Sequence, residues 1–167
     1  MNQSNFRILW LISLFAMCAS GQTQGQVIAL PAAFVPACNI TQLNVAYVAE
    51  LNHQRKLVNP KAKLVQVDAA MLPSTILFNA VLQQRDSLFH DKSHQNVELV
   101  GMSSDLRLQS TDPQLLAKYI YHCFAQSAMG HCEAQDDFTL CHVAISCSEN
   151  YFVVRLNIVA SPIFKRQ

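Results

Sequence analysis

The chain has 167 residues, of which 51% are hydrophobic and only 14% charged, so it can bury the core of one globular domain. Its formal net charge of +1, without a cluster of lysine or arginine, excludes the electrostatic field that nucleic-acid binding requires. The high hydrophobic content, together with only four glycines and six prolines, also excludes a disordered or low-complexity chain.

The amino-terminal segment is typical of a secretory signal peptide. Arg7 precedes an apolar run over residues 8–17, and the small residues 18–21 follow. The run is too short to cross a hydrocarbon core of about 30 Å, so we expect no transmembrane anchor. A lipid-modified Cys18 is the alternative, but the bulky Met17 before it argues against that modification. We therefore expect a signal peptide over 1–21, a lead-in over 22–38 and a single domain over 39–167, located in the periplasm or secreted.

The first helix is predicted to begin just after the lead-in. Asn39 or Thr41 can cap it, and Asn59-Pro60 ends it. One apolar face recurs at helical spacing: Ile40, Leu43, Tyr47, Val48 and Leu51. Residues 64–68 are then expected to be short and extended.

Two further helices follow. Asp68 is a plausible cap for a helical region that reaches about His90, within which Pro73 either separates the first turn or moves the main start to Ser74. The third helix covers residues 114–127, with Thr111 and Gln114 forming a capping box. Its buried face is predicted to hold Leu116, Ile120, Cys123, Phe124 and Ser127.

Three strands are predicted: residues 96–102, and a hairpin of residues 138–147 and 151–158. Strict alternation would turn His142 away from Cys141 and place Leu140 on the face opposite Val143. The last strand should present one apolar face: Phe152, Val154, Leu156 and Ile158. This order of elements predicts an α+β fold in which helices pack against a small antiparallel sheet.

The sequence has six cysteines. Removal of the signal peptide would take Cys18 with it, so an odd number of cysteines would remain. One thiol must then stay free or link two chains into a covalent dimer. Cys141 and Cys147 would lie roughly 20 Å apart along one strand, too far for a disulfide. Cys132 and Cys141 flank the helix-to-strand connection and are the preferred disulfide pair, whereas Cys123 is expected to be a buried small apolar residue.

Three polar residues at element boundaries are candidates for a site. His90 follows a helix, Glu98 lies on a short strand, and His131 opens a helix after Gly130. Two imidazoles and a carboxylate could bind a divalent ion with one position open, or transfer protons without metal. The chain contains none of the motifs GxSxG, HExxH, P-loop and CxxC. His122 beside Cys123 is no nucleophile pair, because adjacent helical residues point in different directions.

A set of short motifs resembles a known family. In chain order they are residues 51–55 (LNHQR), 64–68 (LVQVD), 88–90 (LFH), 95–97 (QNV), 124–127 (FAQS) and 130–132 (GHC), followed by two closing strands. Together they resemble a divergent bacterial member of the CAP superfamily, the SCP-like extracellular domain of cysteine-rich secretory, antigen and plant pathogenesis-related proteins. The resemblance covers roughly residues 39–159 and implies an α-β-α sandwich, in agreement with the predicted element order.

The resemblance also implies a ligand cleft with two histidines and two acidic residues that can hold a metal ion. By motif the histidines are His90 and His131, which would be the ligands of a zinc-like divalent ion. Gln95 stands where the family usually has glutamate, so that carboxylate is either lost or displaced to Glu98. Glu133 is a further carboxylate without a motif to place it. No cofactor is required.

Three functions fit these observations. The resemblance implies a secreted, non-catalytic binding module for a small apolar ligand or an extracellular protein partner. A metal-assisted hydrolase using His90, His131 and Glu98 is the alternative. The third is a structural or interaction domain, which an inter-chain disulfide would fit.

Overall fold

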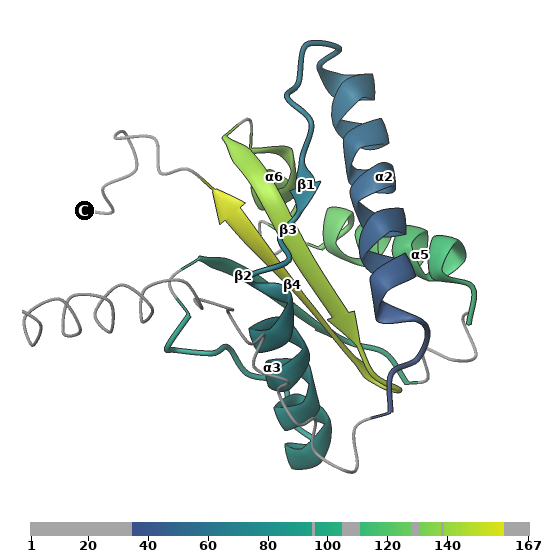
Figure 1. The fold of residues 1–167 in the computed structure, drawn as a ribbon, viewed down its shortest axis with the longest axis vertical. Helices are drawn as coiled ribbons and strands as arrows, with labels where there is room; N and C mark the ends of the chain where they lie inside the picture. Colours follow the sequence, from purple (N-terminus) through teal and green to yellow (C-terminus); the bar gives the residue numbers. More distant parts are fainter. Residues whose placement is uncertain (1–34, 95, 105–110, 128–130, 138, 159–167) are drawn as a thin grey trace, which may run out of the picture.

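The computed structural model describes residues 35–94, 96–104, 111–127, 131–137 and 139–158, without the side chains of Cys132 and Glu133 (Figure 1). The expected signal peptide, most of the lead-in and Gln95 lie outside the described residues. The elements are α2 (Ile40–Val58), β1 (Gln66–Val67), α3 (Leu72–Arg85), β2 (Val97–Met102), α5 (Pro113–Ala125), α6 (His131–Asp136), β3 (Leu140–Cys147) and β4 (Tyr151–Ile158).

A four-stranded sheet, with strands in the order β1-β3-β4-β2, lies between the helices. The pairs β3–β4 and β4–β2 are antiparallel, whereas the short β1 pairs parallel with β3. Helices α2 and α5 pack on each other and on one face, and α3 covers the other (Figure 1). The predicted α+β fold with a sheet between helices is confirmed; β1 makes that sheet mixed.

Helix α2 begins where the sequence places it. The side chain of Asn39 accepts a hydrogen bond from the backbone N–H of Gln42 at 3.0 Å, and the N–H of Asn59 donates to the carbonyl of Arg55 as the helix ends. Leu43, Tyr47 and Leu51 are completely buried against the sheet. The apolar spacing therefore identified both the helix and its buried face.

Helix α3 is shorter than predicted. Asp68 caps the preceding turn, since its side chain accepts from the N–H of Met71 at 2.9 Å, and Pro73 lies in the first turn of the helix. The helix ends at Arg85 because Asp86 adopts a left-handed conformation with φ 48°. There the Asp86 carboxylate accepts from the Tyr151 hydroxyl at 2.8 Å, so extension to about His90 was wrong.

The start of α5 differs by one residue from the prediction. Asp112, rather than Thr111, is the N-cap, and its carboxylate accepts from the N–H of Gln114 at 2.8 Å. A carboxylate suits this position because it also meets the positive end of the helix dipole. The predicted start of a helix at His131 is confirmed by α6.

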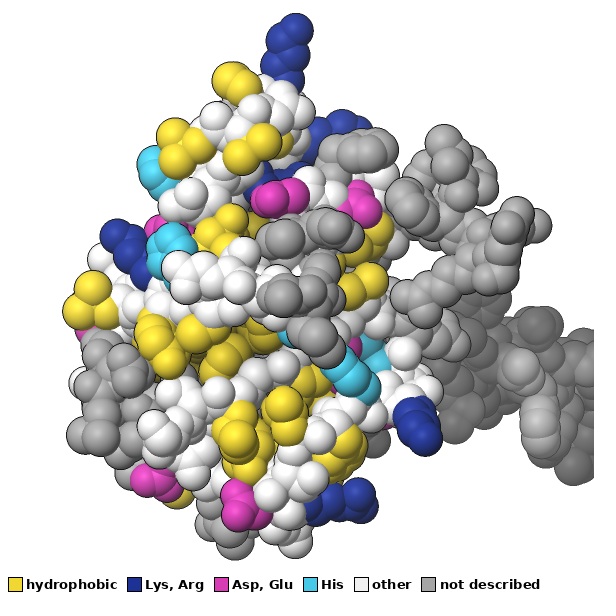
Figure 2. All heavy atoms as spheres, turned by 180° about the vertical axis from the view of Figure 1, so that it is seen from behind, with side chains coloured by type: hydrophobic (Ala, Val, Ile, Leu, Met, Phe, Trp, Pro, Cys, Tyr) yellow, Lys and Arg dark blue, Asp and Glu magenta, His cyan; other side chains and the backbone are white. Residues whose placement is uncertain are grey.

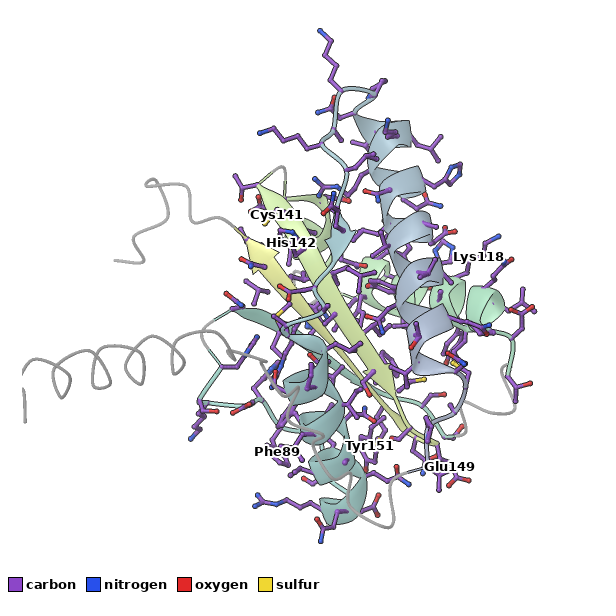
Figure 3. The ribbon with its side chains drawn as sticks, viewed as in Figure 1. Phe89, Lys118, Cys141, His142, Glu149 and Tyr151 are labelled. Atoms are coloured by element: carbon purple, nitrogen blue, oxygen red, sulfur yellow. The ribbon has the colours of Figure 1, made fainter. Side chains whose placement is uncertain are left out.

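A β-bulge at the start of β3 breaks the predicted alternation. The register with β4 shifts between Leu140 and His142, so Leu140 packs in the same core as Val143 and Ile145. The imidazole Nδ1 of His142 lies 3.2 Å from the thiol of Cys141, and Figure 3 shows the two residues together at one end of β3. The expectation that His142 turns away from Cys141 was therefore wrong, because an extra residue cancels one step of the alternation.

The larger core lies between the sheet and the α2–α5 pair. As predicted, Phe152, Val154 and Leu156 face it, with Ile158 at its edge. A Cβ atom at Gly101 on β2 would overlap the Phe152 ring, so only glycine allows this close approach. A smaller core under α3 contains Phe78, Leu82, Val100, Tyr151 and Val153.

Candidate functional site

A buried arginine organises the α3 side of the sheet. Arg155 lies on β4 directly opposite Glu98 on β2, and its side chain is only 1% exposed. Its guanidinium donates to Glu98 Oε2 at 2.9 Å, to Asp91 Oδ2 at 2.7 Å and to Ser74 Oγ at 3.0 Å. Burying a charge is costly unless it is paired and hydrogen-bonded, and here both conditions are met.

We call the group formed by His90, Asp91, His94, Glu98 and Arg155 the Arg155 cluster. Besides its bond to Arg155, Glu98 accepts from the backbone N–H of Asp91 at 2.8 Å. The same oxygen, Oε1, lies 3.4 Å from Nδ1 of His90, whose side chain is 64% exposed. Both oxygens of Glu98 are therefore occupied by protein donors.

The charges of this cluster shift the titration of two members. The pKa of Asp91 is lowered mainly by the hydrogen bond from the Ser93 hydroxyl at 2.6 Å, and Arg155 lowers it further. The pKa of His94 is lowered by burial and then by the charge of Arg155. Its Nε2 is buried without a hydrogen-bond partner among the described residues. Near neutral pH we expect Asp91 charged and His94 neutral.

His131 opens α6 and packs against the larger core. Its ring packs edge-on against Phe124 at a centroid distance of 5.2 Å, and Phe124 belongs to the larger core. Burial lowers the pKa of His131, and the charge of His90 lowers it further. Its Nδ1 is buried without a partner in the described part of the chain. The structure thus brings His90 into contact with Glu98, whereas His131 packs against Phe124.

The Arg155 cluster is a poor place for a metal ion. The guanidinium of Arg155 already pairs with both Glu98 and Asp91, so a divalent cation beside these carboxylates would be repelled by the buried positive charge of Arg155. No group of three or more His, Cys, Asp or Glu among the described residues is arranged to hold a metal. The two-histidine site at His90 and His131 stays a prediction, as does the contribution of Gln95.

A hollow of about 810 Å³ opens beside this cluster, between α3 and residues 89–93. Its apolar wall consists of Leu77, Phe78, Val81 and Phe89, and its polar rim of Ser74, Arg85, His90, Asp91, Lys92 and Ser93. Ser74, Phe78 and Asp91 also contact Arg155, so the hollow and the Arg155 cluster share a boundary. Its size lies within the range of small-molecule sites.

Two aromatic rings give the hollow a fixed inner surface. Phe78 and Phe89 meet edge to face at 5.6 Å, and Figure 3 shows Phe89 near the end of α3 close to Tyr151. The guanidinium of Arg85 lies 5.4 Å from the centre of the Phe89 ring, and that of Arg155 lies 5.2 Å from the centre of Phe78. Leu77 remains 40% exposed on the same helix, so apolar surface is open to a ligand.

Other apolar surface is spread over the molecule, as the opposite view shows (Figure 2). A hollow of about 690 Å³ between α2 and the start of α5 contains none of the predicted site residues. Another, of about 480 Å³, is bordered by Cys141, Lys61 and Lys63. Of these three hollows in the described part of the chain, the one beside α3 joins apolar surface to a predicted site residue, His90.

The described cysteines contain no disulfide: Cys38, Cys123, Cys141 and Cys147 are thiols. The preferred partner of Cys141 was Cys132, whose side chain lies outside the described residues, so that pairing stays a prediction. The Cys141 thiol donates to the carbonyl of Asn157 at 3.2 Å, which directs its hydrogen away from His142. This contact does not fit an activated Cys/His nucleophile pair.

Sequence reasoning found His90, Glu98 and His131 but missed Arg155, Asp91 and the hollow. An arginine within the apolar run of residues 151–158 was the available signal, since a charge on a buried strand needs a partner nearby. The signal for the hollow was the pair Leu77 and Val81, four residues apart on α3, of which Leu77 is exposed and Val81 partly buried.

None of the helices within the described ranges combines the length and apolar character needed to cross a bilayer. Comparison of the chain with protein-family models, with curated proteins and with solved structures gave no match. The resemblance to the CAP superfamily therefore rests on the motifs and their order alone.

Proposed function

We propose that this protein is an exported, CAP-like binding module that takes a small apolar ligand into the hollow beside α3 without chemically changing it. The observation that carries the proposal is the hollow itself: about 810 Å³, walled by Leu77, Phe78, Val81 and Phe89 and rimmed by charged side chains. Small-molecule sites typically combine such an apolar wall with a few polar groups that fix orientation.

The surroundings of the hollow also favour binding over catalysis. The polar groups nearest to it are engaged with one another, since Arg155 holds Ser74 and Asp91 in place. Such a network orders these side chains before any ligand binds, which reduces the conformational entropy lost on binding. It leaves His90, Arg85 and Lys92 at the rim to contact a polar end of the ligand.

Replacing Leu77 by aspartate should weaken binding of an apolar ligand at least about fivefold. The new carboxylate would have to lose part of its hydration beside a bound apolar molecule, which is unfavourable. Titration with N-phenyl-1-naphthylamine, an uncharged fluorophore that brightens in apolar surroundings, measures the dissociation constant. Leu77 is 40% exposed, so the variant should still fold.

Leu115→Asp is the matched control, because Leu115 is also an exposed leucine on a helix, 57% exposed on α5, and does not line this hollow. Its affinity for the probe should equal that of the wild type. Equal weakening in both variants, or no saturable binding by the wild type, would refute the proposed site.

A two-histidine metal site is the second candidate, and the buried Nδ1 of His131, which has no partner among the described residues, favours it. Because burial lowers the pKa of His131, its imidazole is neutral and able to coordinate near pH 7. In this reading the bound ion would lower the pKa of its water, as the hydrolase alternative requires. The engagement of Glu98 with Arg155 counts against a complete catalytic set.

Zinc should bind weakly, lose affinity below about pH 6, and fail to bind His131→Ala. Gln95→Glu should tighten binding by adding a charged ligand. Calorimetric titration with zinc alone measures these affinities. His53→Ala is the control, since His53 is exposed on α2. Unchanged affinity in His131→Ala would place the ion elsewhere, and no binding to the wild type or to Gln95→Glu would exclude the metal site.

A further inference from the structure

Two cysteines that are 109 positions apart in the chain meet at the edge of the larger core. The Sγ atoms of Cys38 and Cys147 lie 4.0 Å apart. Cys147 is the last residue of β3 and is fully buried, whereas Cys38 is half-buried and directly precedes Asn39, the cap of α2. Neither cysteine belongs to the hollow beside α3 or to the Arg155 cluster.

Backbone contacts hold this meeting point in place independently of the two thiols. The N–H of Ala37 donates to the carbonyl of Cys147 at 3.3 Å, and Pro36 forms an antiparallel bridge with Ser148. Ser148 is fixed in turn by its N–H, which donates to the carbonyl of Tyr151 at 2.8 Å across the β3–β4 turn. The two chain segments are therefore paired by their main chains, and the cysteine side chains are carried into contact.

We infer that Cys38 and Cys147 form a disulfide bond in the mature protein. A disulfide requires the sulfur atoms to approach to about 2.05 Å, which rotation of a side chain can supply when the sulfurs are already in contact. Cys38 has room for this rotation, because it is half-buried and its other contact is a weak one, to its neighbour's carbonyl at 3.8 Å. The inference does not depend on the proposed ligand site.

The chemistry of the pair gives an order of events. Contact with Cys147 lowers the pKa of Cys38, while contact with Cys38 and burial raise the pKa of Cys147. The Cys38 thiolate attacks the disulfide of an oxidant, either a thiol–disulfide oxidoreductase or a small-molecule disulfide, and one oxidant sulfur leaves as a thiolate. Cys147 then loses its proton and attacks the Cys38 sulfur, expelling the second oxidant sulfur. Two protein thiols are oxidised and one oxidant disulfide is reduced.

The bond would join the start of α2 to the end of β3, and the loop it closes includes most of the described elements. Closing a long loop removes many conformations from the unfolded chain and so stabilises the folded state. Together with the predicted Cys132–Cys141 pair, it would leave Cys123, half-buried on α5, as the unpaired thiol of the mature chain.

Differential alkylation of the full chain tests the pairing. Protein equilibrated with excess oxidised glutathione is denatured, its free thiols are blocked with N-ethylmaleimide, and the disulfides are then reduced and labelled with iodoacetamide. Fragment-ion mass spectrometry reads the label on each cysteine, which is needed because no Lys or Arg separates Cys123, Cys132, Cys141 and Cys147. We expect Cys38 and Cys147 to carry the second label, and the oxidised protein to melt roughly 5–15 °C above the reduced protein.

The variants identify the partner. In Cys147→Ala, Cys38 should be free or joined to glutathione, which the intact mass before reduction shows, and in Cys38→Ser the second label should disappear from the buried Cys147. Cys141→Ala should leave both labels unchanged. Blocking of both Cys38 and Cys147 by N-ethylmaleimide in the oxidised wild type would overturn the inference without recourse to any variant. Persistence of the second label on Cys38 in Cys147→Ala, with no bound glutathione in the intact mass before reduction, would overturn it as well.

Discussion

Replacing Arg155 by methionine should lower the free energy of unfolding by about 3–5 kcal/mol, because it leaves the carboxylates of Glu98 and Asp91 without their cation. Glu98 is only 5% exposed, so water cannot restore the lost interaction. Urea denaturation monitored by far-UV circular dichroism measures the change. A loss below about 1 kcal/mol would show that the ion pair is not what holds β2, β4 and residues 89–93 together.

Acid provides a check on the same prediction. The pKa of Asp91 is lowered in the folded state, so its contribution to stability is present above the unfolded pKa of about 3.9 and is lost as the pH falls through the lowered value. A protonated carboxyl needs no cation. The difference between wild type and Arg155→Met should therefore be smaller at pH 3 than at pH 7.

The double variant Arg155→Met with Glu98→Gln is the matched control for this charge. A neutral amide at position 98 removes the more deeply buried carboxylate, so the double variant should be more stable than Arg155→Met alone. If it were less stable, loss of packing rather than an unpaired charge would explain the effect.

Replacing Leu156 by alanine should cost about 2–5 kcal/mol, since the side chain is completely buried in the larger core. On β4 this residue lies between Val97 of β2 and Val143 of β3, so the loss would leave a cavity that neither neighbouring strand can easily fill. Thermal or urea denaturation gives the change in stability.

Leu57→Ala is the control, because Leu57 is 67% exposed near the end of α2 and should change stability by less than about 0.5 kcal/mol. A loss that small for Leu156→Ala would mean that the buried face of β4 has been assigned wrongly.

The features that the sequence predicted correctly are encoded within a few residues of chain. Asn39 caps α2 through its own neighbours, and the alternation of residues 151–158 is enough to identify the buried face of β4. Helical spacing and alternation are local patterns, and one amphipathic element can be recognised without knowing its partner. The same holds for the helix start at His131.

The features that the sequence did not reveal depend on partners far along the chain. Asp86 ends α3 where its carboxylate meets Tyr151, which is 65 positions away, and Arg155 meets Asp91 across 64 positions. The bulge between Leu140 and His142 is a matter of register with β4 and leaves no local pattern. The site followed the same division: His90, Glu98 and His131 were marked by their place at element boundaries, while Arg155 required the pairing of β2 with β4.

The strand order also decides when this fold can form during synthesis. The two central strands, β3 and β4, are the last elements of the described chain, and the outer strands β1 and β2 pair with nothing else in the sheet. No pair of strands in the sheet can therefore form before β3 or β4 has left the ribosome, and the sheet is complete only after both have done so. Until then α2, α3 and α5 have no sheet to cover. A nascent chain that lacks β3 and β4 therefore cannot complete its stable packing, so folding of this domain must follow the synthesis of β4.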